Sequence, residues 1–203
     1  MSFSSCFGQE QGYAVFDSST GTLTFTCSKP TVGTLGKDYW ITDNTGDGDP
    51  GWYGYRTSIT KVVFESTYTN TRPLKCTSWF KNFVNLKEIE GIENLKTENV
   101  TNMESMFASC SRLESLDVSA FETKAVKNMA AMFTECKKLT FLNVSRFDTR
   151  EVEYMHAMFS GCTNLSSLNV SNFKTNKVKF MNNMFKDCKS LSTLDVSDLT
   201  YRI

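Results

Sequence analysis

The amino-acid sequence predicts an α/β solenoid: a right-handed stack of coils, each with a short helix followed by a short parallel strand, closed by a β-rich N-terminal cap. A 26-residue repeat predicts the stack of coils, because periods of this length are typical of stacked repeat architectures. Within each repeat, apolar residues follow first a helical and then a strand period. The repeat disappears before residue 58, which predicts the cap.

The repeat has the pattern V-x-x-M-x-x-M-F-x-x-C-x-x-L-x-x-L-[DN]-V-S-x-F-x-T, with Leu199 in place of Phe in the last copy. The regular copies occupy 100–125, 126–151, 152–177 and 178–203, and their cysteines are Cys110, Cys136, Cys162 and Cys188. Degenerate copies precede them over 59–99. We therefore divide the chain into a cap, 1–58, and a repeat region, 59–203.

Each copy contains two different apolar spacings. The i, i+3, i+4, i+7 spacing of one face of a short helix is shown by Met103, Met106, Phe107 and Cys110. Further along, Leu116 and Val118 alternate with polar residues, as in a strand with one face inward. We expect parallel rungs of one sheet at Val62, Ile89, Leu116, Leu142, Leu168 and Leu194.

The first part of the chain lacks the repeat and reads as a hairpin followed by turns. Strand-like runs at 13–16 and 22–27 flank the turn sequence 17–21, which predicts an antiparallel hairpin. Residues 36–57 are turn-rich and aromatic. An atypical terminal unit of this kind is expected to cover the exposed end of a repeat stack.

Composition limits the classes of function. The 203 residues include 22 basic and 22 acidic side chains, and this zero formal charge gives no support for nucleic-acid binding. No apolar run reaches the roughly 18 residues of a membrane span, so none is expected. The first residues lack a basic segment followed by an apolar one, so no signal peptide is visible.

The seven cysteines cannot all pair with one another, and four of them lie within the apolar repeat pattern. We expect free, buried thiols rather than disulfides. No C-x-x-C occurs and His156 is the only histidine, so a zinc site has little support. The acidic loop 43–49 has the wrong spacing for an EF-hand. We expect no metal, cofactor or catalytic residue, and not an enzyme.

Several segments resemble the BspA-like leucine-rich repeats of bacterial surface proteins of the Bacteroides type. In the repeats these are 100–103, 106–110 and 116–123; upstream they are 44–46, 50–53, 59–64 and 89–92. The resemblance is close over 59–199 and looser over 13–58. It implies a leucine-rich-repeat-like coil, a location at the cell surface or in the secreted fraction, and adhesion or protein binding without catalysis. It provides no motif of binding residues.

The candidate binding surface follows from strand alternation. If Leu116 and Val118 point inward, their neighbours and the equivalent residues of later copies point to solvent. These candidates are Ser115, Asp117, Phe141, Asn143, Ser167, Asn169, Thr193 and Asp195. Such a row suits partner binding, and it equally suits a face that is merely solvated. Phe141 stands apart, because an outward aromatic side chain is a plausible anchor.

We expect a non-catalytic interaction or adhesion module that binds a protein or a host-surface ligand through this face. The alternative is a spacer or assembly element that stacks through its C-terminal coil, with a possible homo-oligomer. Five lysines against Asp187 between 174 and 189 could form a basic end that docks an acidic partner, or simply a solvated face.

Overall fold

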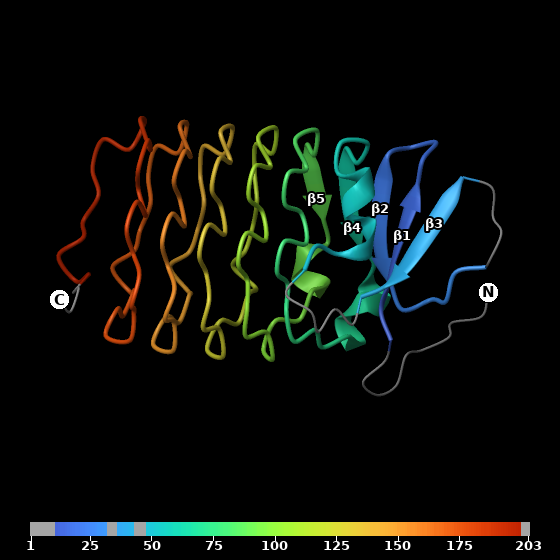
Figure 1. Ribbon diagram of the computed structural model, residues 1–203, viewed down its shortest axis with the longest axis horizontal. Coiled ribbons are helices and arrows are strands. Elements are labelled where there is room, and N and C mark those ends of the chain that lie inside the picture. The colour runs from blue at the N-terminus through green and yellow to red at the C-terminus, as the bar shows by residue number, and fades with distance from the viewer. Residues whose placement is uncertain (1–10, 32–35, 43–47, 200–203) are drawn as a thin grey trace.

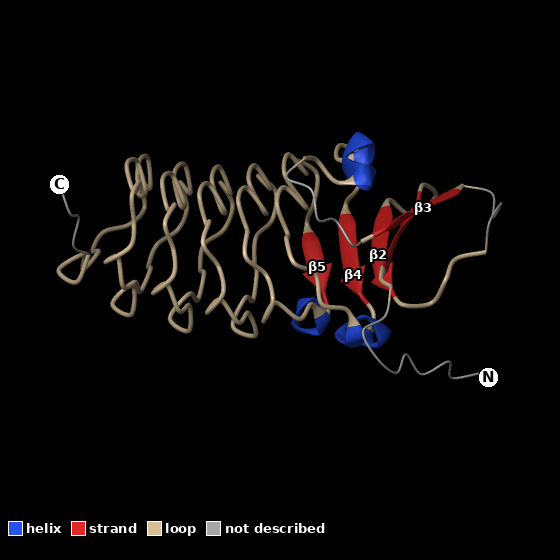
Figure 2. Ribbon diagram, turned by 60° about the horizontal axis from the view of Figure 1, so that its bottom comes forward, coloured by secondary structure: helices blue, strands red, loops and turns tan. Residues whose placement is uncertain are grey.

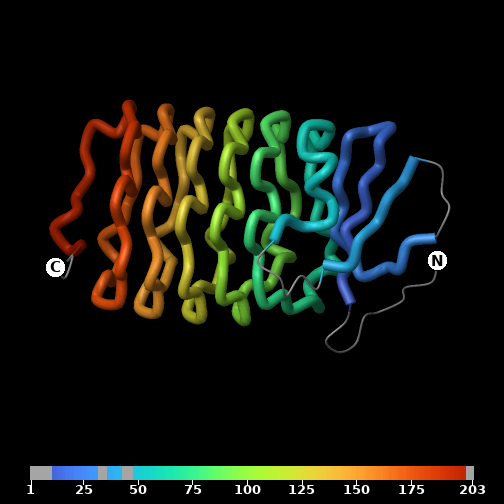
Figure 3. Tube along the Cα trace, viewed as in Figure 1, coloured from blue at the N-terminus to red at the C-terminus, as the bar shows by residue number. Residues whose placement is uncertain are grey.

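The computed structural model describes residues 11–31, 36–42 and 48–199. A sheet of five strands lies at the N-terminal end, and from there the chain runs in successive circuits that lie side by side along the long axis (Figure 1). We call each circuit, from one residue to its equivalent about 26 positions later, a coil. The tube view shows the same regular spacing of coils up to the last described repeat (Figure 3).

The sheet is mixed, with the strand order β3-β1-β2-β4-β5. Its strands are β1 (Tyr13–Asp17), β2 (Thr22–Thr26), β3 (Lys37–Ile41), β4 (Lys61–Phe64) and β5 (Glu88–Glu90). The expected hairpin is confirmed, because β1 pairs antiparallel with β2. β3 pairs antiparallel with the other side of β1, whereas β2, β4 and β5 are parallel to one another.

The pairing of β2 with β4 carries the sheet across residue 58. The hairpin turn depends on Gly21, whose φ of +67° lies in the left-handed region and whose N–H donates to the Asp17 carbonyl at 2.9 Å. Three short 3-10 helices complete the regular structure: η1 (Gly51–Tyr55), η2 (Ser66–Asn70) and η3 (Ile92–Asn94).

The predicted α/β solenoid of alternating helix and strand is wrong. The described residues contain no α-helix, and beyond η3 they contain no strand, so the repeats consist of turns and loops (Figure 2). The leucine-rich-repeat description fails for the same reason, since it requires a strand in every coil. Described residues also include no helix long and apolar enough to cross a membrane.

The failure of the helix has a local cause. Ser105 and Ser109 have φ of +55° and +61°, which interrupts any right-handed helix over 103–110. Every second N–H group of this segment closes a four-residue turn: Met106 donates to Met103 at 3.2 Å, Ala108 to Ser105 at 3.1 Å and Cys110 to Phe107 at 3.1 Å. Turns of this kind place Met and Phe inward at the same spacing as a helix would.

The N–H groups of the four residues that alternate with these turns bond to the next coil instead. Met103, Ser105, Phe107 and Ser109 donate to carbonyls 25 residues ahead, at 2.9, 2.9, 2.9 and 2.7 Å. The same four positions donate forward from 76–82, from 129–135 and from 155–161. Every N–H of this ladder points toward the C-terminal end, and every carbonyl accepts from the preceding coil. We call it the donor ladder.

The expected parallel sheet of six rungs is realised only at β4 and β5, where Val62 faces Ile89. At the four later positions the described chain forms no strand, and a single parallel bridge joins Phe141 to Ser167. The main-chain pairing of the repeats therefore lies mostly on the side of the coil that was predicted to be helical. The strand-like segments are held by their inward side chains.

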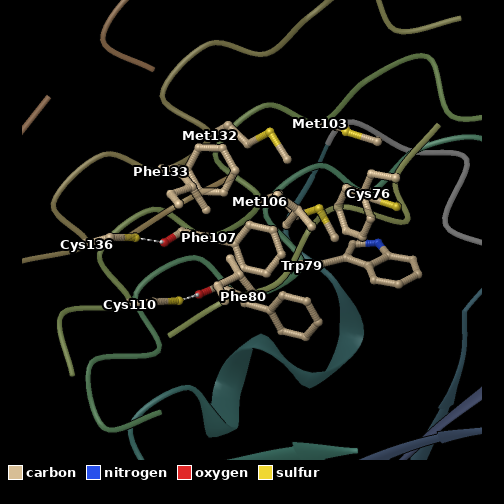
Figure 4. Packing of buried hydrophobic residues seen from close by; sticks show 14 of the residues in the cluster. Cys76, Trp79, Phe80, Met103, Met106, Phe107, Cys110, Met132, Phe133 and Cys136 are labelled. Carbon is tan, nitrogen blue, oxygen red and sulfur yellow. Dashed lines mark hydrogen bonds between the residues drawn. The ribbon is translucent and has the colours of Figure 1, made fainter. Parts of the chain in front are cut away.

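The core runs through the middle of the coils without a break. Phe107, Phe133 and Phe159 are fully buried and form a stack of near-parallel rings, 5.7 and 5.8 Å apart. Trp79 and Phe80 continue this packing toward the sheet, as the close view shows (Figure 4). Stacked rings gain both apolar burial and dispersion contact.

Threonines at the end of each repeat pattern provide a second link between coils. The buried Thr123 hydroxyl donates to the Asp148 carbonyl at 3.0 Å and accepts from the Asp148 N–H at 2.8 Å. Thr97 and Thr149 make the same pair of bonds to the coil that follows each. A single buried hydroxyl thus satisfies two main-chain groups of the following coil, which gives this position a reason to be Thr.

Five cysteines of the described chain carry free thiols, as expected: Cys76, Cys110, Cys136, Cys162 and Cys188. From Cys110 onward, each repeat thiol donates to the carbonyl of a phenylalanine in the preceding coil, with Cys110 to Phe80 and Cys136 to Phe107 at 3.1 Å (Figure 4). Burial raises the pKa of the Cys110 and Cys136 thiols, and raises that of Cys162 to about 12. These thiols are therefore protonated at neutral pH and are not nucleophiles.

Candidate binding surface

Strand-like alternation persists along the candidate face even though the strands are absent. Leu116, Val118, Leu142, Val144, Leu168 and Val170 are buried. All eight candidate residues lie on the other side of the chain: Asn143 is half-buried, and the rest are exposed, namely Ser115, Asp117, Phe141, Ser167, Asn169, Thr193 and Asp195. The inward and outward sets are thus as the sequence analysis assigned them. In the last coil Val196 departs from the pattern, because 45% of it is exposed.

Phe141 forms a ridge between two shallow hollows. Its side chain is 62% exposed, the highest value among the large exposed apolar residues of the described chain. A hollow of about 500 Å³ on the N-terminal side has Ser115, Asp117, Phe141 and Asn143 in its wall. One of about 490 Å³ on the other side is bounded by Phe141, Asn143, Ser167, Asn169, Thr193 and Asp195. The two hollows together bring all eight candidates into one surface, which we call the Phe141 face.

The hollow toward β5 is acidic. Its lining includes Glu93, Glu114 and Asp117, together with the apolar side chains of Ile89 and Ile92. Hydrogen bonds from Ser119 hold the pKa of Asp117 below its usual value, and a hydrogen bond from Lys138 at 2.8 Å does the same for Glu114. The Asp117 and Glu114 carboxylates are therefore ionised at neutral pH.

The acidic or amide residue of each rung also has a structural role. The Asp117 Oδ1 accepts the N–H of Ser119 at 2.9 Å, and Asn143, Asn169 and Asp195 accept equivalent N–H groups at 3.1, 3.0 and 2.9 Å. Such Asx turns reverse the chain after the strand-like segment. They occupy one oxygen of each side chain, so the second oxygen or the amide nitrogen stays available to a partner.

A second aromatic surface was missed by the sequence analysis. Tyr154 and Phe180 stack at 5.8 Å, and 51% of Phe180 is exposed. Isolated parallel bridges join Asn102, Asn128, Tyr154 and Phe180 in one row on the donor-ladder side. In the repeat pattern this position is variable, so the only available signal was the aromatic residue in the last two copies.

Metal and catalytic sites were not expected, and the part of the chain described here offers no cluster of three His, Cys, Asp or Glu side chains able to hold an ion. The Nδ1 of His156 is buried and lacks a hydrogen-bond partner within that part. Most of the acidic loop 43–49 lies outside the described residues.

Comparison with known proteins gives one match. A family model described as "Mycoplasma protein of unknown function, DUF285" matches residues 74–199, a range that contains the whole donor ladder. Neither the curated proteins nor the solved structures contain a match to this chain.

Proposed function

We propose that this chain, which belongs to the DUF285 family because the family model covers more than half of it, is a non-catalytic module that binds other proteins through the Phe141 face. The observation that carries the proposal is Phe141 itself. An aromatic side chain with 62% of its surface in water, standing between two hollows, is costly to expose and well placed to be covered.

The chemistry of the two hollows suggests the kind of partner. On one side, Glu93 and Asp117 supply carboxylates next to apolar surface. On the other, Asn169, Ser167 and Thr193 supply neutral hydrogen-bonding groups. A polypeptide segment with a basic residue two or three positions from an apolar one would satisfy both the ring and the carboxylates.

Two further parts of the proposal concern catalysis and location. The non-catalytic role is supported by the raised pKa of the buried thiols, which removes the repeated cysteines as nucleophiles. The resemblance of the repeat motifs to BspA-like bacterial surface proteins supports adhesion as the biological purpose. On that resemblance we assign the protein to the cell surface or the secreted fraction.

The proposal can be tested without knowing the natural partner. The purified chain is used to select binders from a phage-displayed library of random short peptides, and the affinity of each selected peptide is then measured by calorimetry. Phe141→Ala is expected to weaken binding by about 30-fold, because a central aromatic anchor contributes roughly 2 kcal/mol. Selected peptides are expected to be enriched in Lys or Arg near an apolar residue.

Phe180→Ala provides the matched control, since Phe180 is also an exposed phenylalanine of the repeats but lies outside both hollows. It should leave the affinity unchanged, and both variants should retain the circular dichroism spectrum of the parent. Peptides that bind Phe141→Ala as tightly as the parent chain would refute the proposed face.

A further inference from the structure

The hollow of about 490 Å³ beside Phe141 is lined differently from its acidic neighbour. Apart from the Phe141 ring, the half-buried or exposed side chains that line it are small and polar: Asn143, Ser145, Ser167, Asn169, Thr193 and Asp195. Its lining, taken over the described residues, includes no lysine or arginine, and Asp195 is the only charged member. We call it the polar hollow. It suits a ligand that is uncharged and offers several hydrogen-bonding groups.

The floor of the polar hollow gives a ligand little apolar surface. Leu142, Leu168 and Val170 belong to its lining, but 9% or less of each side chain is exposed because all three point into the core. The ring of Phe141, with 62% exposed, is the one large apolar surface. A ligand therefore meets a single aromatic side chain surrounded by polar groups.

The two amide groups of the polar hollow are held in a fixed orientation. The Asn143 Oδ1 accepts the N–H and the hydroxyl of Ser145, at 3.1 and 2.7 Å. The Asn169 Oδ1 accepts the same two groups of Ser171, at 3.0 and 2.8 Å. Because each Oδ1 is engaged in its turn, each Nδ2 is left as a donor whose direction is set by the fold. A ligand would not have to order these groups.

A carboxylate and two hydroxyls complete the set of polar groups. The Asp195 Oδ1 accepts the Ser197 N–H at 2.9 Å, which leaves the Oδ2 as an acceptor. Ser167 and Thr193 are exposed at equivalent positions of successive coils, and a hydroxyl both donates and accepts. The polar hollow thus combines oriented donors, an acceptor and two groups that serve as either.

Carbohydrate is the ligand class that matches this combination. A pyranose ring is rimmed by hydroxyl groups, each of which donates and accepts, and its C–H groups pack on the electron-rich face of an aromatic ring. A peptide offers only one N–H and one C=O per residue of main chain. The volume of about 490 Å³ lies within the roughly 300–1,000 Å³ of small-molecule sites.

We propose that the polar hollow binds a neutral oligosaccharide, with one pyranose ring packed on Phe141 and its hydroxyls bonded to Asn169 and Asp195. The site shares Phe141 and Asn143 with the acidic hollow and otherwise uses different side chains. It goes beyond the proposed protein binding and does not depend on it. A glycosylated protein would fit both hollows at once.

The test exposes the parent chain to an array of immobilised oligosaccharides, in which neutral chains built from glucose, galactose, mannose and N-acetylhexosamines appear beside sulfated ones. Neutral members should bind. Sulfated members should bind more weakly, because the lining supplies a carboxylate and no cation. The affinity of the neutral oligosaccharide that binds best is then measured by calorimetry for the parent chain and its variants.

Asn169→Asp is the decisive variant. Asp117 and Asp195 make the same turn in other coils, so the fold should be retained while the amide donor becomes a carboxylate. The affinity should fall about tenfold or more. Asn164→Asp is the matched control, since it makes the same change at an exposed asparagine of the same coil that lies outside both hollows. It should leave the affinity unchanged.

Phe141→Ala removes the aromatic surface and should also weaken oligosaccharide binding by about tenfold. A parent chain that binds no neutral member of the array, or only sulfated members, would overturn the proposal. An Asn169→Asp variant that binds as tightly as the parent would do the same.

The array and the peptide selection give separate answers. Selected peptides without any bound oligosaccharide would overturn the carbohydrate site alone. Oligosaccharide binding without any selected peptide would support the carbohydrate site and contradict the protein-binding role.

Discussion

At the scale of single residues, the repeated cysteines are buried hydrogen-bond donors whose protonation supports the fold. Cys162 donates to the Phe133 carbonyl at 3.1 Å, and burial raises its pKa from 9.0 to about 12. A raised pKa means that the folded state favours the protonated thiol. The stabilisation is complete below pH 9 and is lost progressively as the pH rises toward 12.

The predicted result is a decline in the free energy of unfolding between pH 9 and 12, to which Cys162 contributes up to about 4 kcal/mol. Denaturant unfolding at several pH values measures it. Cys162→Ala should be less stable at neutral pH, because it loses the bond to Phe133, yet its stability should fall less steeply over the same pH range. Parallel curves for the two proteins would show that the thiol does not titrate in this way.

At the scale of the element, the segment that the sequence predicted as a helix is a run of tight turns with left-handed residues at fixed positions. Ala131 has a φ of +53°, which costs a non-glycine residue about 1 kcal/mol. Ala131→Gly is therefore expected to raise the free energy of unfolding by roughly 0.5–1 kcal/mol. The neighbouring Ala130, which is buried and is not among the left-handed residues, should respond to the same substitution with a loss of similar size.

This pair of variants distinguishes turns from helix directly, by chemical denaturation. In a helix both glycines would destabilise, because neither position would gain from left-handed freedom. A loss of stability in both variants would therefore contradict the turn geometry.

The sequence could predict which side chains point inward, because burial depends on apolar spacing, and Met106, Phe107 and Leu116 satisfy that spacing in turns as well as in regular elements. It could not predict where main-chain bonds go. Whether an N–H bonds within its coil or to the next coil depends on the positive φ of Ser105 and Ala131. Serine and alanine seldom adopt positive φ, so the sequence does not indicate it. Asn183, at the position equivalent to Ser105 and Ala131, and Gly161, at the position equivalent to Ser109, are weak hints.

For the candidate site, strand alternation was sufficient to identify the exposed row and Phe141 within it. The hollows on either side could not be foreseen, because they depend on how the side chains of successive coils lie in space.

At the scale of the whole molecule, successive coils make the same main-chain hydrogen bonds to the coil that follows, so one coil can take the place of another. Residues 103–109 donate to 128–134, and 129–135 donate in the same way to 154–160. Deleting the complete copy 126–151 should therefore leave a folded chain, in which 103–109 donate to 154–160. We expect retained cooperative thermal unfolding together with loss of selected-peptide binding, because Phe141 is removed.

Deletion of only 126–138 is the control. It breaks the register of the phenylalanine stack and of the donor ladder, and should abolish cooperative unfolding. If the half-copy deletion folds as well as the full-copy deletion, the register of the coils does not hold the molecule together.

The most direct test of the proposed binding role is a map of main-chain amide chemical shifts on addition of a peptide selected against the parent chain. We predict that the perturbed amides cluster over 114–118, 140–144 and 166–170 and are strongest around Phe141. Perturbations concentrated instead on β1 to β3, or around Tyr154 and Phe180, would contradict the Phe141 face as the binding surface.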